Sequence, residues 1–160
     1  RAHVRGEICV RGMNVTKGYW RQPDASHDAI DAEGWFRTGD VGYQDEDGFL
    51  YVCDRVKDMI ISGGENVYPA EVESVLYEHP AIAEVAVIGK TDPTWGERVV
   101  AVAALKPDCV LSLEQLAQFA EARLARYKVP RELHIVPALP RNPTGKVLKY
   151  RLREDLPQQA

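Results

Sequence analysis

The stretch DRVKDMIISGGENVYPAEVE, residues 54–73, decides the fold of this chain. Two short apolar runs, 59–62 and 66–68, enclose a Gly-Gly-Glu tip. This pattern is typical of a tight β-hairpin, because glycine adopts the positive φ angles that such turns need. Pro69 follows at a position where helices accept proline, and Glu71 lies in the first helical turn, where the helix dipole favours anions. A hairpin that leads directly into a helix predicts a domain of mixed α+β architecture.

The remaining elements of this domain follow from the hydrophobic pattern downstream. We expect strands at 82–89, 98–105 and 133–136, a helix from its N-cap Ser112 to about Tyr127, and a last short helix at 147–155. Together they predict an α+β fold class: a small C-terminal domain, residues 55–160, with a short β-hairpin and a central three-stranded sheet flanked by helices.

Residues 1–54 have a different pattern, rich in short strands. A strand is expected at 7–10, a turn and short strand at 12–20, a loop or short helix at 22–32, and a tight turn at 38–40. Asp47-Gly48 lies between strand-like runs and is a strong hairpin signal. Since this segment cannot form a complete core, we interpret it as the closing β segment of a larger N-terminal domain, and the chain as part of a longer polypeptide.

Composition argues against several classes of function. The chain has 160 residues, 45% of them hydrophobic, and a net charge of −4. Nucleic-acid binding is disfavoured, because phosphate neutralisation requires a basic excess. No apolar run approaches the roughly 20 residues needed to span a bilayer, which leaves only peripheral membrane contact open. Three separated cysteines without a CxxC pair indicate neither disulfides nor a zinc site, so we expect a reducing, cytoplasmic location and no metal ligands.

Three charged residues are candidates for chemistry. Lys146 lies on a turn bounded by proline and glycine, and a cation on a movable turn suits chemistry that brings two anions together. Asp40 is a carboxylate in a predicted tight turn, and Arg55 presents a rigid fork of donors near the junction of the two parts. Each has an ordinary alternative: a solvated lysine, an aspartate bonded to its own turn, and an ion pair of Arg55 with Asp54 or Asp58.

Four motifs in the right order resemble one family. They are GEICVRGMNVTKGYW (6–20), GWFRTGDVG (34–42), DRVKDMIISGGENVYPAEVE (54–73) and PRNPTGKVLKYRL (140–152). Together they resemble the C-terminal domain of the adenylate-forming enzymes, most closely the acyl-CoA synthetases, or fatty-acid–CoA ligases. The resemblance implies a two-step reaction: a fatty or aromatic carboxylate attacks the α-phosphate of ATP to give acyl-AMP and pyrophosphate, and coenzyme A then displaces AMP. It also implies that Mg²⁺ arrives with ATP and has its protein ligand in the N-terminal domain.

The resemblance also implies roles for individual residues. Lys146 is expected to be the catalytic residue of the adenylation step, and Asp40 and Arg55 are expected to bind the ribose of ATP or AMP. The remaining assignments are Lys57 as the hinge of the small domain, and Ser62, Gly63 and Gly64 as the hairpin tip that approaches the pantetheine arm of coenzyme A. The ordinary alternatives are a plain surface lysine and a turn that merely needs positive φ.

Three functions for the whole protein remain open at this point. The leading one is an ATP-dependent acyl-CoA ligase, whose partners are a small carboxylic acid, ATP, coenzyme A and its own N-terminal domain; we expect the isolated chain to be inactive. The second is a ligase that passes its adenylate to a carrier protein, and the third is a non-catalytic interaction module. A basic set, with Arg123 and Arg126 three residues apart on the predicted helix and Lys128 and Arg131 nearby, either meets the 3′-phosphate of coenzyme A or forms a solvated face.

Overall fold

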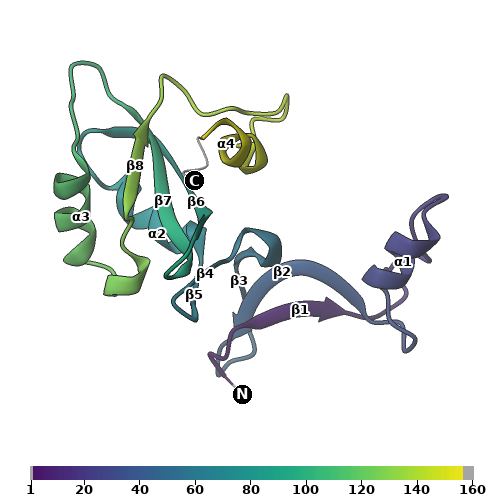
Figure 1. Ribbon diagram of the computed structural model, residues 1–160. Helices are drawn as coiled ribbons and strands as arrows, with labels where there is room; N and C mark the ends of the chain where they lie inside the picture. The colour runs from purple at the N-terminus through teal and green to yellow at the C-terminus, as the bar shows by residue number, and fades with distance from the viewer. Residues whose placement is uncertain (1, 157–160) are drawn as a thin grey trace. The chain divides into compact units, whose positions relative to one another are not determined.

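The structure is a computed structural model that describes residues 2–156. The chain divides into two compact units, Arg1–Lys57 and Asp58–Ala160 (Figure 1). The two units divide after Lys57, three residues beyond the boundary expected after residue 54. No helix within residues 2–156 has the length and apolar character needed to cross a membrane.

The smaller unit is built on a three-stranded antiparallel sheet. Its elements are the strands β1 (Gly6–Val10), β2 (Phe36–Gln44) and β3 (Leu50–Arg55), in that order, and the short helix α1 (Pro23–Ala29) between β1 and β2 in sequence. The predicted hairpin at Asp47-Gly48 is confirmed, since Gly48 adopts a φ of 87° and Tyr43 pairs with Tyr51 across β2 and β3. At 22–32 the chain takes the helical alternative, α1.

The strand predicted within residues 12–20 is wrong. The segment forms bends and turns, with an isolated bridge at Tyr19. The Thr16 hydroxyl donates to the Gly18 carbonyl and accepts from the Gly18 amide, and the Ser26 hydroxyl accepts from the Tyr19 amide at 2.8 Å. These hydroxyls occupy backbone groups that a strand ladder would need, so local bonding prevails over strand propensity.

The tight turn predicted at 38–40 is instead a bulge within the continuous strand β2. The register between β1 and β2 shifts at this point. Gly39 adopts a φ of 71°, and the Thr38 hydroxyl donates to the Ile8 carbonyl at 2.8 Å, which holds the bulge against β1. A bulge re-aims a side chain without ending its strand, and here it sets the position of Asp40.

The larger unit confirms the predicted α+β class around a five-stranded sheet. Its elements are the strands β4 (Ile60–Ser62), β5 (Glu65–Val67), β6 (Ile82–Asp92), β7 (Gly96–Leu105) and β8 (Glu132–Ile135), the helices α2 (Pro69–Tyr77), α3 (Leu113–Glu121) and α4 (Lys149–Asp155), and the 3₁₀ turns η1 (Val56–Asp58), which begins in the smaller unit, and η2 (Arg126–Lys128). The predicted three-stranded sheet is β6–β7–β8, with β8 parallel to β7. The sheet is larger than predicted because the β4–β5 hairpin joins it through the Ser62–Gly96 pair.

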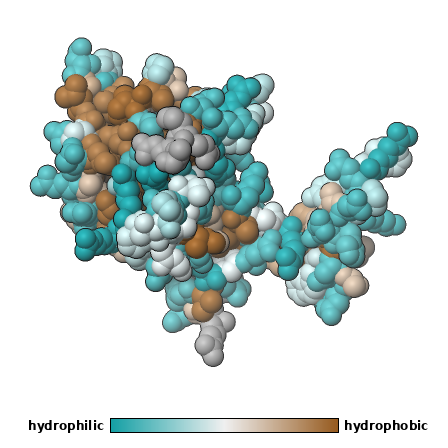
Figure 2. All heavy atoms as spheres, viewed as in Figure 1, coloured by the Kyte–Doolittle hydropathy of each residue, from teal (hydrophilic) through white to brown (hydrophobic). Residues whose placement is uncertain are grey.

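β6 and β7 are buried on both faces, which explains their unbroken apolar runs. One face packs against α2 and α3, where Leu76 and Leu116 meet Val99. The opposite face packs against α4, where Leu152 belongs to the same buried cluster as Ile88. Figure 1 shows α3 and α4 on different sides of this sheet, and Figure 2 shows apolar residues that reach the surface of the same unit.

The long helix predicted to run to about Tyr127 ends early. Its start is confirmed, because Ser112 and Gln115 form a reciprocal capping box. α3 stops at Glu121, and the chain then turns before η2, which allows Leu124 to reach the core. Arg123 and Arg126 therefore do not share a helix face. The burial of Leu124 in the core outweighs the helix propensity of this segment.

Candidate functional site

The Asn142 side chain closes the loop that carries Lys146. The Asn142 Oδ1 atom accepts from the backbone amides of Thr144 at 3.1 Å and Lys146 at 2.8 Å, and from the Thr144 hydroxyl at 2.8 Å. The Asn142 amide in turn donates to the Lys146 carbonyl at 2.9 Å. The result is a closed Asx-type turn with a fixed backbone.

Arg141 connects this loop to the central sheet. Its Nη1 atom donates to the Gly145 carbonyl at 2.6 Å, and its Nη2 atom bonds the Glu84 carboxylate of β6 at 2.8 Å. The Lys146 side chain is exposed, and within residues 2–156 no carboxylate forms an ion pair with its ammonium. The loop therefore presents an unpaired, flexible cation on a stiff backbone.

Asp40 and Arg55 lie opposite one another on β2 and β3. They are register partners, and the Arg55 Nε atom lies 3.0 Å from the Asp40 Oδ1 atom. The alternative ion pair with Asp58 is not observed, because Asp58 pairs with Arg153, and the Asp54 carboxylate accepts from the Arg55 backbone amide at 2.8 Å. The structure thus brings together two residues that the sequence places in separate motifs.

Lys57 lies at the boundary of the two units. It is exposed and belongs to η1. The next residue, Asp58, is fixed by an ion pair with Arg153 of α4 at 2.9 Å, with only 15% of the Asp58 side chain exposed. The larger unit therefore begins with an anchored residue directly after an unburied lysine.

The hairpin predicted at Ser62–Gly64 is confirmed, and the roles of its three residues differ. Gly63 and Gly64 form the two-residue turn, with φ angles of 61° and 83°, which match the requirement of a type I′ turn. Ser62 is a buried residue of β4 paired with Glu65, so it lies below the tip instead of on it. Apart from its chain neighbours, no heavy atom of residues 2–156 lies within 4 Å of a Cβ built on Gly64, whereas a Cβ on Gly63 would approach the Trp95 ring to 2.8 Å.

An aromatic and basic groove adjoins the hairpin. It has a volume of about 430 Å³ and is lined by Trp95, Arg126, Tyr127 and Arg131. The Arg131 guanidinium carbon lies 4.0 Å from the centroid of the Trp95 ring, and the Gly63 amide donates to the Trp95 carbonyl at 2.8 Å. Cationic groups beside flat aromatic rings suit an anionic ligand with a planar base.

The predicted basic set divides into two pairs. Arg126 and Arg131 line the groove, whereas Lys128 forms an ion pair with Glu71 of α2. The Arg123 guanidinium lies 3.9 Å from the centroid of the Phe119 ring and bonds the Phe119 carbonyl. The two aromatic residues of the groove, Trp95 and Tyr127, are not among the predicted site residues, although a tryptophan in a polar turn between two apolar strands indicates such a site.

A cluster of charged side chains links the strands β6, β7 and β8. Lys90 of β6 is buried and lies 2.9 Å from the Glu132 carboxylate of β8, which also contacts Arg98 and His134. Burial alone raises the pKa of Glu132, but hydrogen bonds and charges from Lys90 and His134 lower that pKa below its ordinary value. The cluster therefore ties three strands together with an ionised carboxylate.

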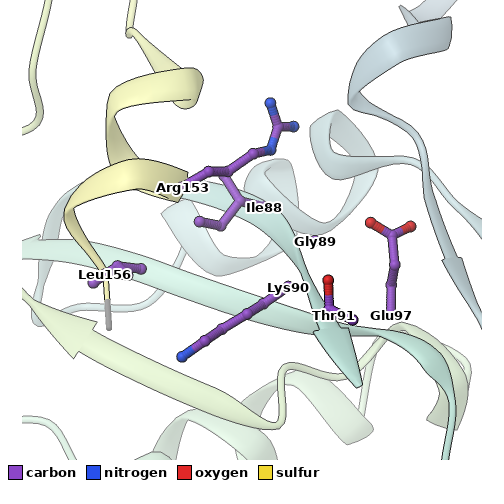
Figure 3. Close-up of a pocket in the computed structure, with 7 residues that line it drawn as sticks. All are labelled: Ile88, Gly89, Lys90, Thr91, Glu97, Arg153 and Leu156. Atoms are coloured by element: carbon purple, nitrogen blue, oxygen red, sulfur yellow. The ribbon is translucent and has the colours of Figure 1, made fainter. Parts of the chain in front are cut away.

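This cluster adjoins a small pocket of about 200 Å³, drawn in Figure 3, and the charged residues that line it already have partners. Lys90 pairs with Glu132, Arg153 with Asp58, and Glu97 accepts from a backbone amide. Within residues 2–156, no group of three or more histidine, cysteine or acidic side chains is placed to hold a metal ion.

The C-terminal residues match a known family. Residues 71–146 match the AMP-binding enzyme C-terminal domain. The chain carries the C-terminal domain of the adenylate-forming enzymes. The predicted resemblance is thereby confirmed, and the relatives of this adenylate-forming domain are acid–thiol ligases.

Three relatives illustrate the similarity. The chain is 52% identical over 157 residues to the 2-succinylbenzoate–CoA ligase of Geobacillus sp. (strain WCH70), covering 98% of this chain and 32% of that protein. It is 51% identical over 154 residues to the long-chain-fatty-acid–CoA ligase FadD13 of Mycobacterium tuberculosis (strain CDC 1551 / Oshkosh), covering 96% and 30%. The structure of o-succinylbenzoate CoA synthetase (MenE) from Bacillus subtilis with the acyl-adenylate intermediate OSB-AMP matches with a TM-score of 0.88 and 43% identity, covering 100% and 32%. The chain spans about a third of the length of these relatives.

Proposed function

We propose that the whole protein is an ATP-dependent, AMP-forming acyl-CoA ligase, and that this chain supplies its mobile C-terminal domain and the strands that precede it. The observation that carries the proposal is the exposed ammonium of Lys146, which forms no ion pair within residues 2–156, on a loop whose backbone is fixed by Asn142. A stiff loop delivers a charge to a defined place, while the flexible lysine stem adjusts to the reacting groups.

In the adenylation step Lys146 stabilises the approach of two anions. A carboxylate oxygen attacks the α-phosphate of ATP, the bond to the pyrophosphate leaving group breaks, and negative charge grows on the phosphate oxygens. One well-placed donor of this kind is typically worth about 3 kcal/mol, or roughly a hundredfold in rate. The ammonium binds both the carboxylate and the phosphate, and withdraws when the domain reorients.

Asp40 and Arg55 bind the ribose of the nucleotide. The Arg55 Nε atom occupies one carboxylate oxygen of Asp40, and the other oxygen accepts from the vicinal hydroxyls. Both side chains are partly exposed, as a ligand contact requires.

Coenzyme A transfer uses the other end of the larger unit. The bare backbone of Gly63 and Gly64 lets the narrow pantetheine arm pass, since nothing projects from Gly64. The adjoining groove suits the nucleotide part, with Trp95 and Tyr127 beside the base and Arg126 and Arg131 beside the phosphates. The thiolate attacks the acyl carbon, and AMP leaves. Reorientation about Lys57 exchanges the Lys146 loop for the hairpin between the two steps.

Mg²⁺ is expected to arrive with ATP and to have its protein ligand in the N-terminal domain. Within residues 2–156, no group of three or more histidine, cysteine or acidic side chains is placed to hold a metal ion, so no metal-binding role is assigned to these residues. The acid is of the fatty or aromatic class, as the two relatives act on 2-succinylbenzoate and on a long-chain fatty acid.

The decisive experiment is an assay of the full-length protein with ATP, coenzyme A and a panel of aliphatic and aromatic acids. Thioester formation with at least one acid is expected. Lys146→Ala should lower acid-dependent pyrophosphate exchange about a hundredfold and spare thioester formation from preformed acyl-AMP. Exchange without any thioester, but with loading of a carrier protein, would identify the carrier-protein ligase; no exchange with any acid would leave a non-catalytic module.

A further inference from the structure

The hairpin that carries Gly63 and Gly64 has a narrow attachment to the rest of its sheet. β4 and β5 have three residues each, and a hairpin of this size is marginal on its own. The register of β4 with β7 consists of one pair, Ser62 with Gly96. The tip therefore depends on contacts other than a regular strand ladder.

Glu97 of β7 supplies such a contact. Its Oε2 atom accepts from the Ile61 amide of β4 at 2.7 Å, so that a side-chain carboxylate replaces the ladder carbonyl. A charged acceptor makes this bond stronger than an ordinary backbone pair. Within residues 2–156, Glu97 forms no ion pair, which leaves the hairpin amide as its partner.

The surroundings of Glu97 are shaped to admit this carboxylate. Figure 3 shows Glu97 and Gly89 among the residues that line the small pocket. A Cβ on Gly89 would lie 2.6 Å from the Glu97 Oε1 atom and 3.2 Å from the Ile60 side chain. Any residue larger than glycine at position 89 would displace either the Glu97 carboxylate or β4.

The turn between β6 and β7, which precedes Glu97, holds the hairpin at a second point. The Trp95 carbonyl accepts from the Gly63 amide at 2.8 Å. The Asp92 carboxylate fixes the turn, since it accepts from the amides of Thr94 at 2.9 Å and Trp95 at 3.0 Å. Two hairpin amides, those of Ile61 and Gly63, are thus bonded to acceptors in or directly after the turn between β6 and β7.

We propose that Glu97 is a positioning residue for the transfer of the acyl group to coenzyme A: its carboxylate holds β4 so that the Gly63-Gly64 backbone and the Trp95 groove keep the spacing that the coenzyme requires. This inference rests on the proposed ligase function. Glu97 acts on the coenzyme through the hairpin and has no part in adenylation, which belongs to the Lys146 loop.

The test compares three substitutions of Glu97 in the full-length enzyme. Glu97→Ala removes the acceptor, Glu97→Asp keeps the charge but shortens the reach by one methylene, and Glu97→Gln keeps an acceptor oxygen at full reach. The first two should raise the KM for coenzyme A at least tenfold, as expected for loss of a charge-assisted bond. Glu97→Gln should stay within about threefold of the parent, because a neutral acceptor retains part of that bond. Pyrophosphate exchange should be unchanged in all three.

Glu65→Ala is the matched control, because this glutamate lies on the same hairpin with an exposed side chain. It should leave both half-reactions unchanged. Equal losses in pyrophosphate exchange and coenzyme A transfer, or a Glu97→Gln variant as impaired as Glu97→Asp, would overturn the positioning role. Since Glu97→Asp keeps the charge and loses only one methylene, it keeps the test informative where the alanine variant fails to fold. A parent enzyme that makes no thioester refutes the ligase function itself, whereas an active parent with unaffected Glu97 variants refutes only this inference.

Discussion

Asn142→Ala is the substitution that most directly tests whether a stiff loop matters for Lys146. The Asn142 Oδ1 atom accepts three hydrogen bonds, two from backbone amides and one from a hydroxyl. Each of these bonds contributes about 0.5–1.5 kcal/mol net, and the exposed amides regain part of this by bonding water. We therefore expect the ordered conformation of the loop to lose about 2 kcal/mol of its stability relative to disordered conformations. That loss corresponds to roughly a 30-fold decrease in adenylation rate.

The assay is acid-dependent pyrophosphate exchange by the full-length enzyme, with thioester formation from preformed acyl-AMP as the second readout. Asn142→Ala should impair the first and spare the second, and the melting temperature should change little because the loop is exposed. Pro143→Ala, an exposed neighbour that accepts none of these bonds, is the matched control. Exchange at the parental rate in Asn142→Ala would refute the idea that the loop backbone has to be fixed.

Two further predictions concern the hairpin and the buried charge cluster. Gly63→Ala should raise the KM for coenzyme A more than Gly64→Ala, because both incur the strain of positive φ, about 1–2 kcal/mol, but only the first also displaces Trp95; equal effects in steady-state kinetics would argue against the groove. The lowered pKa of Glu132 contributes stability that is present above its unfolded value, 4.5, and is lost as the pH falls through the lower folded pKa. Glu132→Gln should therefore flatten the acid limb of a melting-temperature profile and lower the melting temperature near pH 7, since Lys90 then remains buried without a charge partner; an unchanged acid limb would contradict this.

Local rules were sufficient for the parts of the fold whose determinants lie close together in sequence. The glycine pair, Pro69 at the start of α2 and the Ser112 cap each act within a few residues, and the structure confirms all three. The exposure of Lys146 also follows from its proline- and glycine-bounded turn.

The features that escaped prediction depend on residues distant in sequence. The groove requires Trp95 from the β6–β7 turn and Arg131 from the segment before β8, and no periodicity links these positions. The early end of α3 reflects burial of Leu124 in a core assembled from several elements. The bulge at 38–40 depends on a hydrogen bond to β1, 30 positions away in the chain.

The Asp40–Arg55 ion pair has a consequence for mutagenesis. Each side chain limits the rotamers of the other before any ligand arrives, with 33% of the aspartate and 46% of the arginine side chain exposed. Replacing either residue alone also frees the side chain of its partner. A single variant therefore loses nucleotide affinity for two reasons: its own contact with the ligand is missing, and the partner side chain is no longer held in position before binding. Only a double-mutant cycle that replaces both residues separates the two contributions.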